Sequence, residues 1–264
     1  MHSLSGQNII LMGGTTGLGL SAAKKLVAAG VRVVVSSRSQ VNVDAAVEAL
    51  GPNARGFAAD AATPEAAERA VEVAVGEFGR VDGLYHIAGG SGRSRGDGPL
   101  HEMTDEGLHY TLDLNLNSVI YSNRAAVRQF LKQGSGGVIL NMASVLGYSP
   151  SAQFFASHAY AAAKAGIIGF SKSIAAYYAP QNIRVNVIAP ALVETPMSQR
   201  AVSNDAIMNF VKTKQPLDGG RIGQPTDCDA AALLLLSADS QFITGQVLAV
   251  DGGWTVSEGQ LSAS

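Results

Sequence analysis

The sequence predicts an α/β fold in which one parallel, doubly wound sheet is covered by helices on both faces. Three observations support this fold class. Short runs rich in valine and isoleucine alternate with longer helical segments along the whole chain. The strand-like runs are apolar without a period of two, which is typical of strands buried on both faces. No proline- or serine-rich linker interrupts the alternation, so residues 1–264 are predicted to form one domain.

Each expected element follows from its local pattern. A helix start is indicated at Thr63-Pro64-Glu65 by a capping hydroxyl, a first-turn proline and an acid near the positive helix end. Thr104 is the expected cap of a later helix. The expected strands are Asn8–Met12, Val31–Ser36, Ala54–Ala59, Val81–Ile87, Gly137–Met142, Ile183–Ile188 and Gln246–Val250. The expected helices are Gly17–Ala29, Val43–Leu50, Pro64–Phe78, Thr104–Leu131, His158–Ala179, Ser198–Lys214 and Thr226–Ser237.

Composition excludes several classes of protein. The formal net charge of −2 argues against a nucleic-acid binder, which usually carries a basic excess. No segment reaches the roughly 18 apolar residues that a membrane helix needs, and Met1 to Asn8 does not read as a secretory signal. The single cysteine, Cys228, cannot form an internal disulfide and is interpreted as structural. A cytoplasmic protein is therefore expected.

A glycine-rich turn follows the first expected strand. Gly13, Gly17 and Gly19 have the spacing G-x-x-x-G-x-G, and Thr15 and Thr16 add hydroxyl donors. Glycine lets the backbone turn sharply and lets a pyrophosphate approach closely, while the following helix start offers unpaired N–H groups. A tight turn without a ligand is the simpler interpretation of such a cluster. The strand before it and the helix after it favour a dinucleotide site.

The residues after the second expected strand indicate which nicotinamide cofactor binds. An acid at this place would bind the ribose hydroxyls of NAD, but the chain has Ser37-Arg38. A guanidinium can pair with a 2′-phosphate, so NADP(H) is predicted over NAD(H), the alternative being a solvated surface arginine. Asp60, with Ala61 after it, follows the third strand, where it either reaches the adenine edge or only makes a turn.

Tyr160 and Lys164 are the strongest candidates for chemistry. Their i, i+4 spacing places both side chains on one face of the expected helix. We expect the ammonium to favour the phenolate and so to lower the pKa of Tyr160, which could then exchange a proton with a substrate oxygen. Ser144, after the fifth strand, can hold the same oxygen by a hydrogen bond. Taken singly, these residues and Asn115 have common structural explanations, and only their joint order favours catalysis.

With these residues in place, the sequence resembles the short-chain dehydrogenase/reductase family over nearly its whole length. The resemblance implies a seven-stranded Rossmann sheet and usually a homotetramer. It also implies roles: Tyr160 as acid/base, Ser144 orienting the carbonyl, Lys164 binding the nicotinamide ribose and Asn115 helping to hold a water in a proton relay. The residues that carry it are Gly13, Gly17, Gly19, Ala88-Gly89, Asn115, Ser144, Tyr160, Lys164, Asn186, Pro190, Thr195 and Gly245–Gly253.

Further cofactor contacts are expected by the same resemblance. The residues that would line the cofactor, with Leu18 of the glycine-rich turn added, are Leu18, Ala88, Gly89, Pro190, Val193 and Thr195. The chain departs from the family pattern at Met12, at His86-Ile87 and at Ala191, and none of these changes removes a catalytic side chain. Met12 and Ile87 are expected to cost polar bonds that brace the central strands.

The substrate is less well specified. Residues 191–218 resemble a mobile lid whose apolar side chains indicate a hydrophobic substrate, although core packing explains them equally well. Phe154 and Phe155 could form another pocket wall. Arg93 and Arg95, in a glycine-rich loop, suggest an anionic or carrier-linked substrate, against the simpler reading of a solvated loop. The histidines show no ligand spacing, so no catalytic metal is expected.

Together these features predict an oxidoreductase that moves a hydride between NADP(H) and a carbonyl or secondary alcohol. A 3-oxoacyl-thioester reductase, a sugar dehydrogenase and a steroid or xenobiotic carbonyl reductase remain open. The partners expected are a small-molecule substrate and further copies of the chain, with no nucleic acid and no membrane. The rival hypothesis is a non-catalytic cofactor-sensing or interaction protein on the same fold, which would be expected to lack Tyr160 or Lys164.

Overall fold

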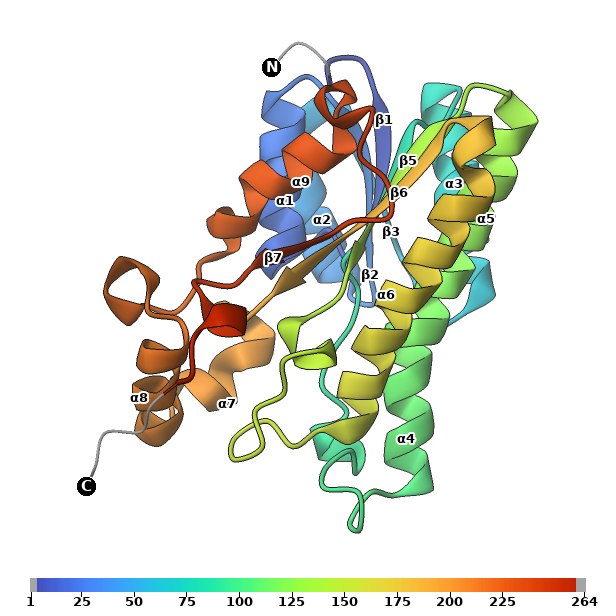
Figure 1. Ribbon diagram of the computed structural model, residues 1–264. Coiled ribbons are helices and arrows are strands. Elements are labelled where there is room, and N and C mark those ends of the chain that lie inside the picture. The colour runs from blue at the N-terminus through green and yellow to red at the C-terminus, as the bar shows by residue number, and fades with distance from the viewer. Residues whose placement is uncertain (1–3, 260–264) are drawn as a thin grey trace.

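A computed structural model describes residues 4–259, which form one seven-stranded sheet with every neighbouring pair parallel. The strand order is β3-β2-β1-β4-β5-β6-β7, so the direction of winding reverses between β1 and β4 (Figure 1). The predicted doubly wound sheet is confirmed; residues 1–3 and 260–264 lie outside the described residues. The strands are β1 Asn8–Met12, β2 Arg32–Ser37, β3 Ala54–Ala58, β4 Gly83–His86, β5 Gly137–Met142, β6 Ile183–Pro190 and β7 Val247–Val250.

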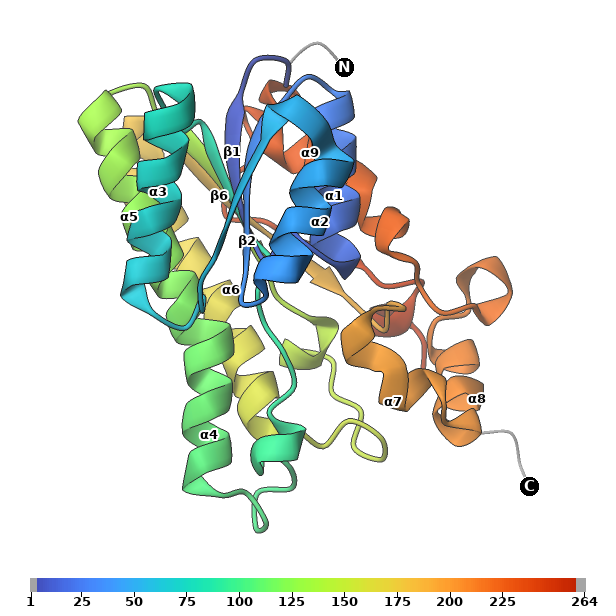
Figure 2. The same cartoon turned by 180° about the vertical axis from the view of Figure 1, so that it is seen from behind.

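Helices cover both faces of the sheet, as Figures 1 and 2 show from opposite sides. Ile9 and Leu11 of β1 pack in the core beneath the first helical layer, and Ile10 and Met12 pack in the core beneath the second. Both faces are therefore apolar, which explains why the strands show no alternation. The first layer consists of α1 Gly17–Ala28, α2 Gln40–Leu50 and α9 Asp229–Leu236; the second consists of α3 Pro64–Phe78, α5 Ser118–Gln133 and α6 His158–Tyr178.

The long helix predicted over Thr104–Leu131 is interrupted. It consists of α4 Asp105–Leu112, a π-helical turn over Asp113–Asn117, and α5. Thr104 caps α4 as predicted, because its hydroxyl accepts from the Gly107 N–H at 3.0 Å. Thr63 also stands at the N-cap of its helix, but its hydroxyl donates to the Asp60 carbonyl instead of capping. The prediction of a capping hydroxyl there is wrong, because a nearer backbone acceptor competes for it.

The lid predicted at residues 191–218 contains two short helices, α7 Gln199–Val202 and α8 Asp205–Lys214. The single helix expected over Ser198–Lys214 is wrong. It breaks where the Asn204 side chain accepts from the Ile207 N–H at 3.0 Å and starts a new helix. Phe210 of α8 packs its ring against Trp254, with centroids 5.7 Å apart, so the lid rests on the C-terminal segment.

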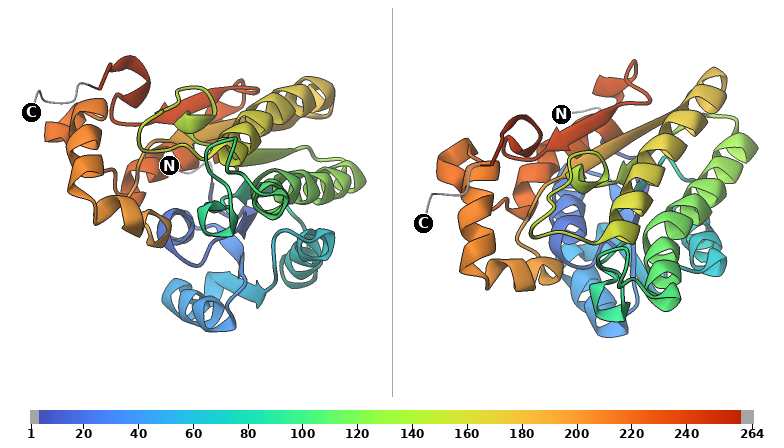
Figure 3. Two further views of the ribbon diagram at one scale, coloured as in Figure 1. Left: turned by 90° about the horizontal axis from the view of Figure 1, so that it is seen from below. Right: turned by 60° about the horizontal axis from the view of Figure 1, so that its bottom comes forward.

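The carboxyl ends of the strands gather at one end of the sheet, below which α7, α8 and the loops before α4 and α6 lie (Figures 1 and 3). Ligands in such sheets bind outside the carboxyl ends at the reversal of strand order. Here β1 and β4 are those two neighbours, and the Ala88 N–H donates to the Met12 carbonyl at 2.8 Å. The segments that follow β1 and β4 are therefore where the fold predicts a ligand site.

Two negative findings concern the class of protein. In the part of the chain that the structure describes, no helix has both the length and the apolar composition needed to cross a membrane. Cys228, the residue directly before α9, is 2% exposed, and burial is the main cause that raises the pKa of its thiol to about 12. The structural interpretation of this cysteine fits a thiol that is neither accessible nor ionised at neutral pH.

Candidate active site

In the glycine-rich turn between β1 and α1, the backbone atoms pack so closely on one another that Gly13 and Gly19 have no space for a side chain. Gly13 has a φ of +89°, and a Cβ there would lie 2.7 Å from the Ala88 nitrogen. A Cβ on Gly19 would lie 2.0 Å from the Gly13 carbonyl oxygen, although its own φ is ordinary. Thr15 is buried within the turn. This arrangement leaves bare backbone at the switch point, which fits the close approach of a diphosphate.

The N-terminus of α1 is open towards the same point. Thr16 is its N-cap residue, yet its side chain makes no capping hydrogen bond. The caps of α2 and α4, Ser39 and Thr104, do accept from their own helices. The first i−4 bond of α1 runs from the Leu20 N–H to the Thr16 carbonyl, so the earlier N–H groups are not used by the helix. Such a terminus is suited to an anion.

The residues predicted to bind the adenosine end follow β2 and β3. Ser37 is the last residue of β2, and Arg38 after it is exposed. Asp60 and Ala61 follow β3, where a carboxylate oxygen of Asp60 accepts from the Ala62 N–H at 3.0 Å. That bond belongs to a turn, and Asp60 as a whole is exposed, so both of its predicted roles stay open.

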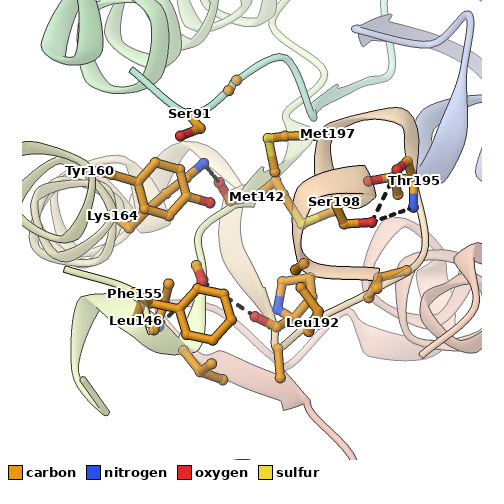
Figure 4. Close-up of a pocket in the computed structure, with 18 of the residues that line it drawn as sticks. Ser91, Met142, Leu146, Phe155, Tyr160, Lys164, Leu192, Thr195, Met197 and Ser198 are labelled. Carbon is orange, nitrogen blue, oxygen red and sulfur yellow. Dashed lines mark hydrogen bonds between the residues drawn. The ribbon is translucent and has the colours of Figure 1, made fainter. Parts of the chain in front are cut away.

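A pocket lies beneath residues 191–218, and Leu18 of the glycine-rich turn lines it. Figure 4 shows side chains of its walls. Its walls are apolar on the lid side, where Met197 and Leu192 lie opposite Tyr160. Of the predicted site residues, eight line it: Leu18, Gly89, Ser144, Tyr160, Lys164, Pro190, Val193 and Thr195. The other predicted residues surround it or lie farther along the strand ends.

Tyr160 and Lys164 stand on one face of α6, as their spacing predicted. The Lys164 ammonium lies 5.4 Å from the centroid of the Tyr160 ring and donates to the Met142 carbonyl at 3.0 Å (Figure 4). Burial lowers the pKa of Lys164 to about 8. It also raises the pKa of Tyr160 to about 12, while a hydrogen bond with Ser144 acts in the opposite direction.

The expectation that Lys164 lowers the pKa of Tyr160 is therefore wrong for this state of the protein. Desolvation of the phenol is the dominant cause, and it favours the neutral form. At neutral pH Tyr160 carries its proton, and Lys164 is charged below pH of about 8. A neutral phenol beside an ammonium is prepared to donate a proton, because the phenolate formed would gain the neighbouring positive charge.

Ser144 is fixed between two neighbours at the end of β5. Its hydroxyl oxygen accepts from the Leu146 N–H at 3.2 Å and donates to the Pro190 carbonyl at 3.5 Å. Ser144 is 7% exposed, and its remaining contact is with the Tyr160 hydroxyl. The two hydroxyls therefore converge on one place in the pocket, as predicted from sequence for groups that hold the same substrate oxygen.

Asn115 lies in the π-helical turn and is fully buried. Its amide donates to the Thr111 and Gly90 carbonyls, both at 2.9 Å, and its oxygen accepts from the Gly90 N–H at 3.1 Å. A Cβ on Gly89 would lie 2.8 Å from that oxygen and 3.4 Å from the Lys164 nitrogen. Asn115 thus anchors the loop after β4 beside Lys164. π-Helical turns occur frequently at functional sites.

Asp97 is a site residue that the sequence analysis missed. Its carboxylate is 2% exposed and accepts from the Ala159 N–H at 3.0 Å and the Tyr160 N–H at 3.1 Å. The acid therefore caps the start of α6 and fixes the backbone of the tyrosine. No local signal could have found it, because Asp97 lies in the loop before α4, more than 60 residues away along the chain.

His86 replaces a family asparagine and compensates in part for the expected loss of polar bonds. It is fully buried at the end of β4, where Nδ1 lies 2.7 Å from the Ser122 hydroxyl and Nε2 lies 3.2 Å from that of Ser118. Burial lowers the pKa of His86 to about 3. At Met12 the sulfur accepts from the Ser36 hydroxyl at 3.5 Å. The central strands therefore keep polar contacts to both helical and strand neighbours.

The two arginines of the loop before α4 separate in the structure. Arg93 lines the pocket, whereas Arg95 pairs with Glu106 at 3.6 Å and lies over the Tyr110 ring. Phe155 forms part of the pocket wall as predicted, and Phe154 packs on Phe210.

Within residues 4–259, no group of three or more histidine, cysteine, aspartate or glutamate side chains is arranged to hold a metal ion.

Comparison with known proteins shows the family to which the chain belongs. The family model described as enoyl-(acyl carrier protein) reductase matches residues 13–255. A 2,5-dichloro-2,5-cyclohexadiene-1,4-diol dehydrogenase of Sphingobium indicum is 33% identical over 97% of this chain and 99% of its own. Among solved structures, a short-chain type dehydrogenase/reductase from Mycobacterium ulcerans has a TM-score of 0.89 and 29% identity, covering 97% of this chain and 92% of that one.

A second solved structure is a 3-ketoacyl-(acyl-carrier-protein) reductase from Brucella melitensis complexed with NADH. It has a TM-score of 0.85 and 27% identity, and the match covers 96% of this chain and 100% of the Brucella chain. The sheet, the pocket and these matches define an oxidoreductase with a doubly wound nucleotide-binding type of fold. The chain belongs to the short-chain dehydrogenase/reductase family, and the resemblance drawn from its motifs is confirmed.

Proposed function

We propose that this protein reduces a carbonyl compound to a secondary alcohol, or oxidises that alcohol, with NADP(H) as hydride carrier and Tyr160 as acid/base. One observation carries the proposal: the hydroxyls of Tyr160 and Ser144 interact in a pocket that Leu18 of the glycine-rich turn also lines, with the Lys164 ammonium beside the Tyr160 ring. The NADH complex of the Brucella reductase supports a nicotinamide cofactor in a protein of this fold.

The residues present fit a dinucleotide. Gly13 and Gly19 leave space that any side chain would fill, and the uncapped N-terminus of α1 faces it. Thr195 lies near Gly17, close enough that a Cβ on Gly17 would meet it at 3.4 Å. The predicted set of Thr15, Thr16, Leu18, Ala88, Gly89, Pro190 and Val193 completes the cradle. When bound, the nicotinamide supplies or accepts the hydride.

Side chains of the protein then bind the substrate oxygen and transfer the proton. Ser144 holds the substrate oxygen, and Tyr160 donates its proton to that oxygen as negative charge develops there. Lys164 stabilises the phenolate left behind, and it is also the proposed contact of the nicotinamide ribose. Asn115 fixes the loop at Gly90 and is proposed to help hold the water that returns the proton. The apolar lid excludes bulk water from this step.

The test of the mechanism is Tyr160→Phe, which removes one hydroxyl and keeps the ring. Loss of general acid catalysis is expected to lower kcat by roughly 10²- to 10⁴-fold, while binding of NADPH is retained. Tyr178→Phe, at the far end of the same helix, is the matched control and is expected to be unchanged. Steady-state rates with a panel of ketones and alcohols at both cofactors measure the effect. Undiminished activity of Tyr160→Phe would contradict the mechanism.

The preference for NADP(H) rests on Arg38, because it is exposed after β2 where no acid stands. Arg38→Asp removes the cation and introduces repulsion towards a 2′-phosphate. Loss of a charged hydrogen bond is worth about 1.5–3 kcal/mol, so affinity for NADPH should fall roughly 10- to 100-fold while that for NADH changes little or improves. Fluorescence titration with both cofactors measures this. A wild-type protein that prefers NADH would overturn the proposal.

We also propose a homo-oligomer. Apolar side chains are exposed at and near the edge strand β7: Leu248 is 39% exposed, Leu234 of α9 is 43% exposed, and Phe242 is fully exposed. An unpaired sheet edge with apolar neighbours is a surface that association would cover. Light scattering coupled to size-exclusion chromatography tests it, and a monomer at micromolar concentration would contradict it.

A further inference from the structure

Two arginines stand at the substrate side of the pocket on segments far apart in sequence. Arg93 belongs to the short 3₁₀ turn Arg93–Arg95 before α4, and Arg200 belongs to α7 in the lid. Both line the pocket that contains Tyr160. Arg93 and Arg95 were predicted from the sequence to favour an anionic substrate. In the structure Arg95 does not line the pocket, whereas Arg200 lines it together with Arg93.

The two arginine side chains line the same pocket from segments on either side of it. The positive charge of Arg93 lowers the pKa of Arg200, after the larger effect of burial. The Arg200 side chain also donates to the Phe154 carbonyl at 3.5 Å, so it spans from the lid to the loop before α6. This contact puts Arg200 on the substrate side of the pocket. The glycine-rich turn, where a diphosphate fits, lies at the carboxyl end of β1.

Neither cation has an acidic partner among the described residues. Other arginines of the chain do: Arg95 pairs with Glu106, and Arg221 pairs with Asp218 and Asp227. Asp97, the acid nearest to Arg93 in the chain, is buried and occupied by the start of α6. Two like charges at one pocket mouth repel each other, and an anion placed between them would remove that cost.

Large apolar side chains form much of the rest of the lining, together with the small polar residues Ser91, Ser157 and Ser198. Leu146, Phe155, Leu192 and Trp254 line the same pocket. A substrate that fills it therefore meets apolar contacts along its length and positive charge at one end. Arginine is suited to this task, because its planar fork binds carboxylates and phosphates through two parallel hydrogen bonds. The carbonyl end is fixed independently by Tyr160 and Ser144.

We propose that Arg93 and Arg200 form an anion clamp that selects carbonyl substrates carrying a carboxylate or phosphate group at the end remote from the carbonyl. The inference rests on the proposed function, because Tyr160 sets the place of the reacting carbonyl. Since Arg200 is on the lid and Arg93 is on the opposite loop, an anion bound by both would also draw the lid over the substrate.

The test uses matched pairs of substrates. A series of methyl ketones that end in a carboxylate, from 4-oxopentanoate upwards in chain length, is compared with the neutral primary amides of the same acids. A second series ends in a phosphate monoester. For the wild type, kcat/KM of the best anionic ketone should exceed that of its neutral partner by at least roughly 10- to 100-fold, the effect of a single charged hydrogen bond. The series that shows the larger ratio identifies the carboxylate or the phosphate as the anion.

The variants are Arg93→Gln, Arg200→Gln and the double variant. In the double variant the ratio of kcat/KM for an anionic ketone to that for its neutral amide should fall towards one, because kcat/KM for the anionic ketones falls much more than kcat/KM for the amides, and the dissociation constant of NADPH should not rise. Arg95→Gln is the matched control from the same turn and should keep the full preference. Added salt should reduce the preference of the wild type.

Two failures are distinguishable. If the wild type reduces neutral ketones without favouring any anionic partner, or if the double variant keeps the preference, the clamp is overturned and the proposed function stands. If no ketone or alcohol of either charge is turned over with either cofactor, the proposed function itself fails. Weaker NADPH binding in Arg200→Gln would assign that arginine to the cofactor and also overturn the clamp.

Discussion

The cofactor side and the substrate side of the pocket are constructed in different ways. The proposed diphosphate cradle on the cofactor side is one contiguous turn of seven residues, Gly13–Gly19, held by backbone packed on backbone. The substrate side is assembled from the loop before α4, the loop before α6 and the lid, with side chains that meet only in the folded chain. The difference teaches that a local sequence pattern can specify the first region but not the second.

The largest expected effect breaks the cofactor side. In Gly19→Ala the new methyl group would lie 2.0 Å from the Gly13 carbonyl, so the backbone of the turn must shift. We expect NADPH affinity to fall more than roughly 100-fold, because the diphosphate needs that backbone in place. Fluorescence titration of NADPH measures the loss.

Gly76→Ala is the matched control for this substitution. Gly76 is also a helical glycine, and a Cβ there meets nothing within 4 Å. This change should leave NADPH binding intact and raise the free energy of unfolding by about 0.5–1 kcal/mol, since alanine favours the helix. Equal NADPH affinity in Gly19→Ala and the wild type would show that the turn does not bind the cofactor.

A smaller effect is expected from the substrate side, where Asp97 holds the backbone of Tyr160. Asp97→Ala leaves two buried N–H groups without their acceptor, and kcat should fall roughly 10- to 100-fold as the phenol loses its position. NADPH affinity should stay near that of the wild type. Asp97→Asn, which keeps one side-chain oxygen acceptor, should restore part of kcat. Steady-state rates and NADPH titration check this, and a loss confined to thermal stability would contradict a positioning role.

The smallest effect concerns the strand layer beneath both sides. His86 has a folded-state pKa of about 3, whereas an unfolded histidine titrates near 6.5. Below pH 6.5 the unfolded chain binds more protons, so the contribution of His86 to stability is fully present above that pH and is lost as pH falls. Between pH 6.5 and pH 5 this loss amounts to about 2 kcal/mol.

His86→Asn should remove this part of the acid sensitivity, because asparagine does not titrate. Urea unfolding at pH 7 and pH 5 measures the difference, with the surface variant His101→Asn as control. An unchanged pH dependence in His86→Asn would indicate that other groups cause the acid sensitivity. Activity at pH 7 should be near that of the wild type, because His86 lies outside the pocket walls.

The sequence predicted the sheet and its winding, and eight of its candidate site residues line the pocket, because strand burial, glycine spacing and the i, i+4 pair are local signals. It did not predict the break at Asn204, where a side-chain cap outweighs a continuous helical pattern. It also gave the wrong direction for the pKa of Tyr160, because burial depends on the whole fold. Asp97 and Arg200 were missed since their partners lie far away in the chain.

The buried thiol of Cys228 has a practical consequence for studying the lid. Because it is 2% exposed and its pKa is raised to about 12, alkylating reagents at neutral pH should leave the native chain unlabelled. A cysteine introduced at the exposed Ser203, between α7 and α8, would then be the single reactive position. A fluorophore attached there would test directly whether residues 191–218 open and close, and no cysteine would first have to be removed.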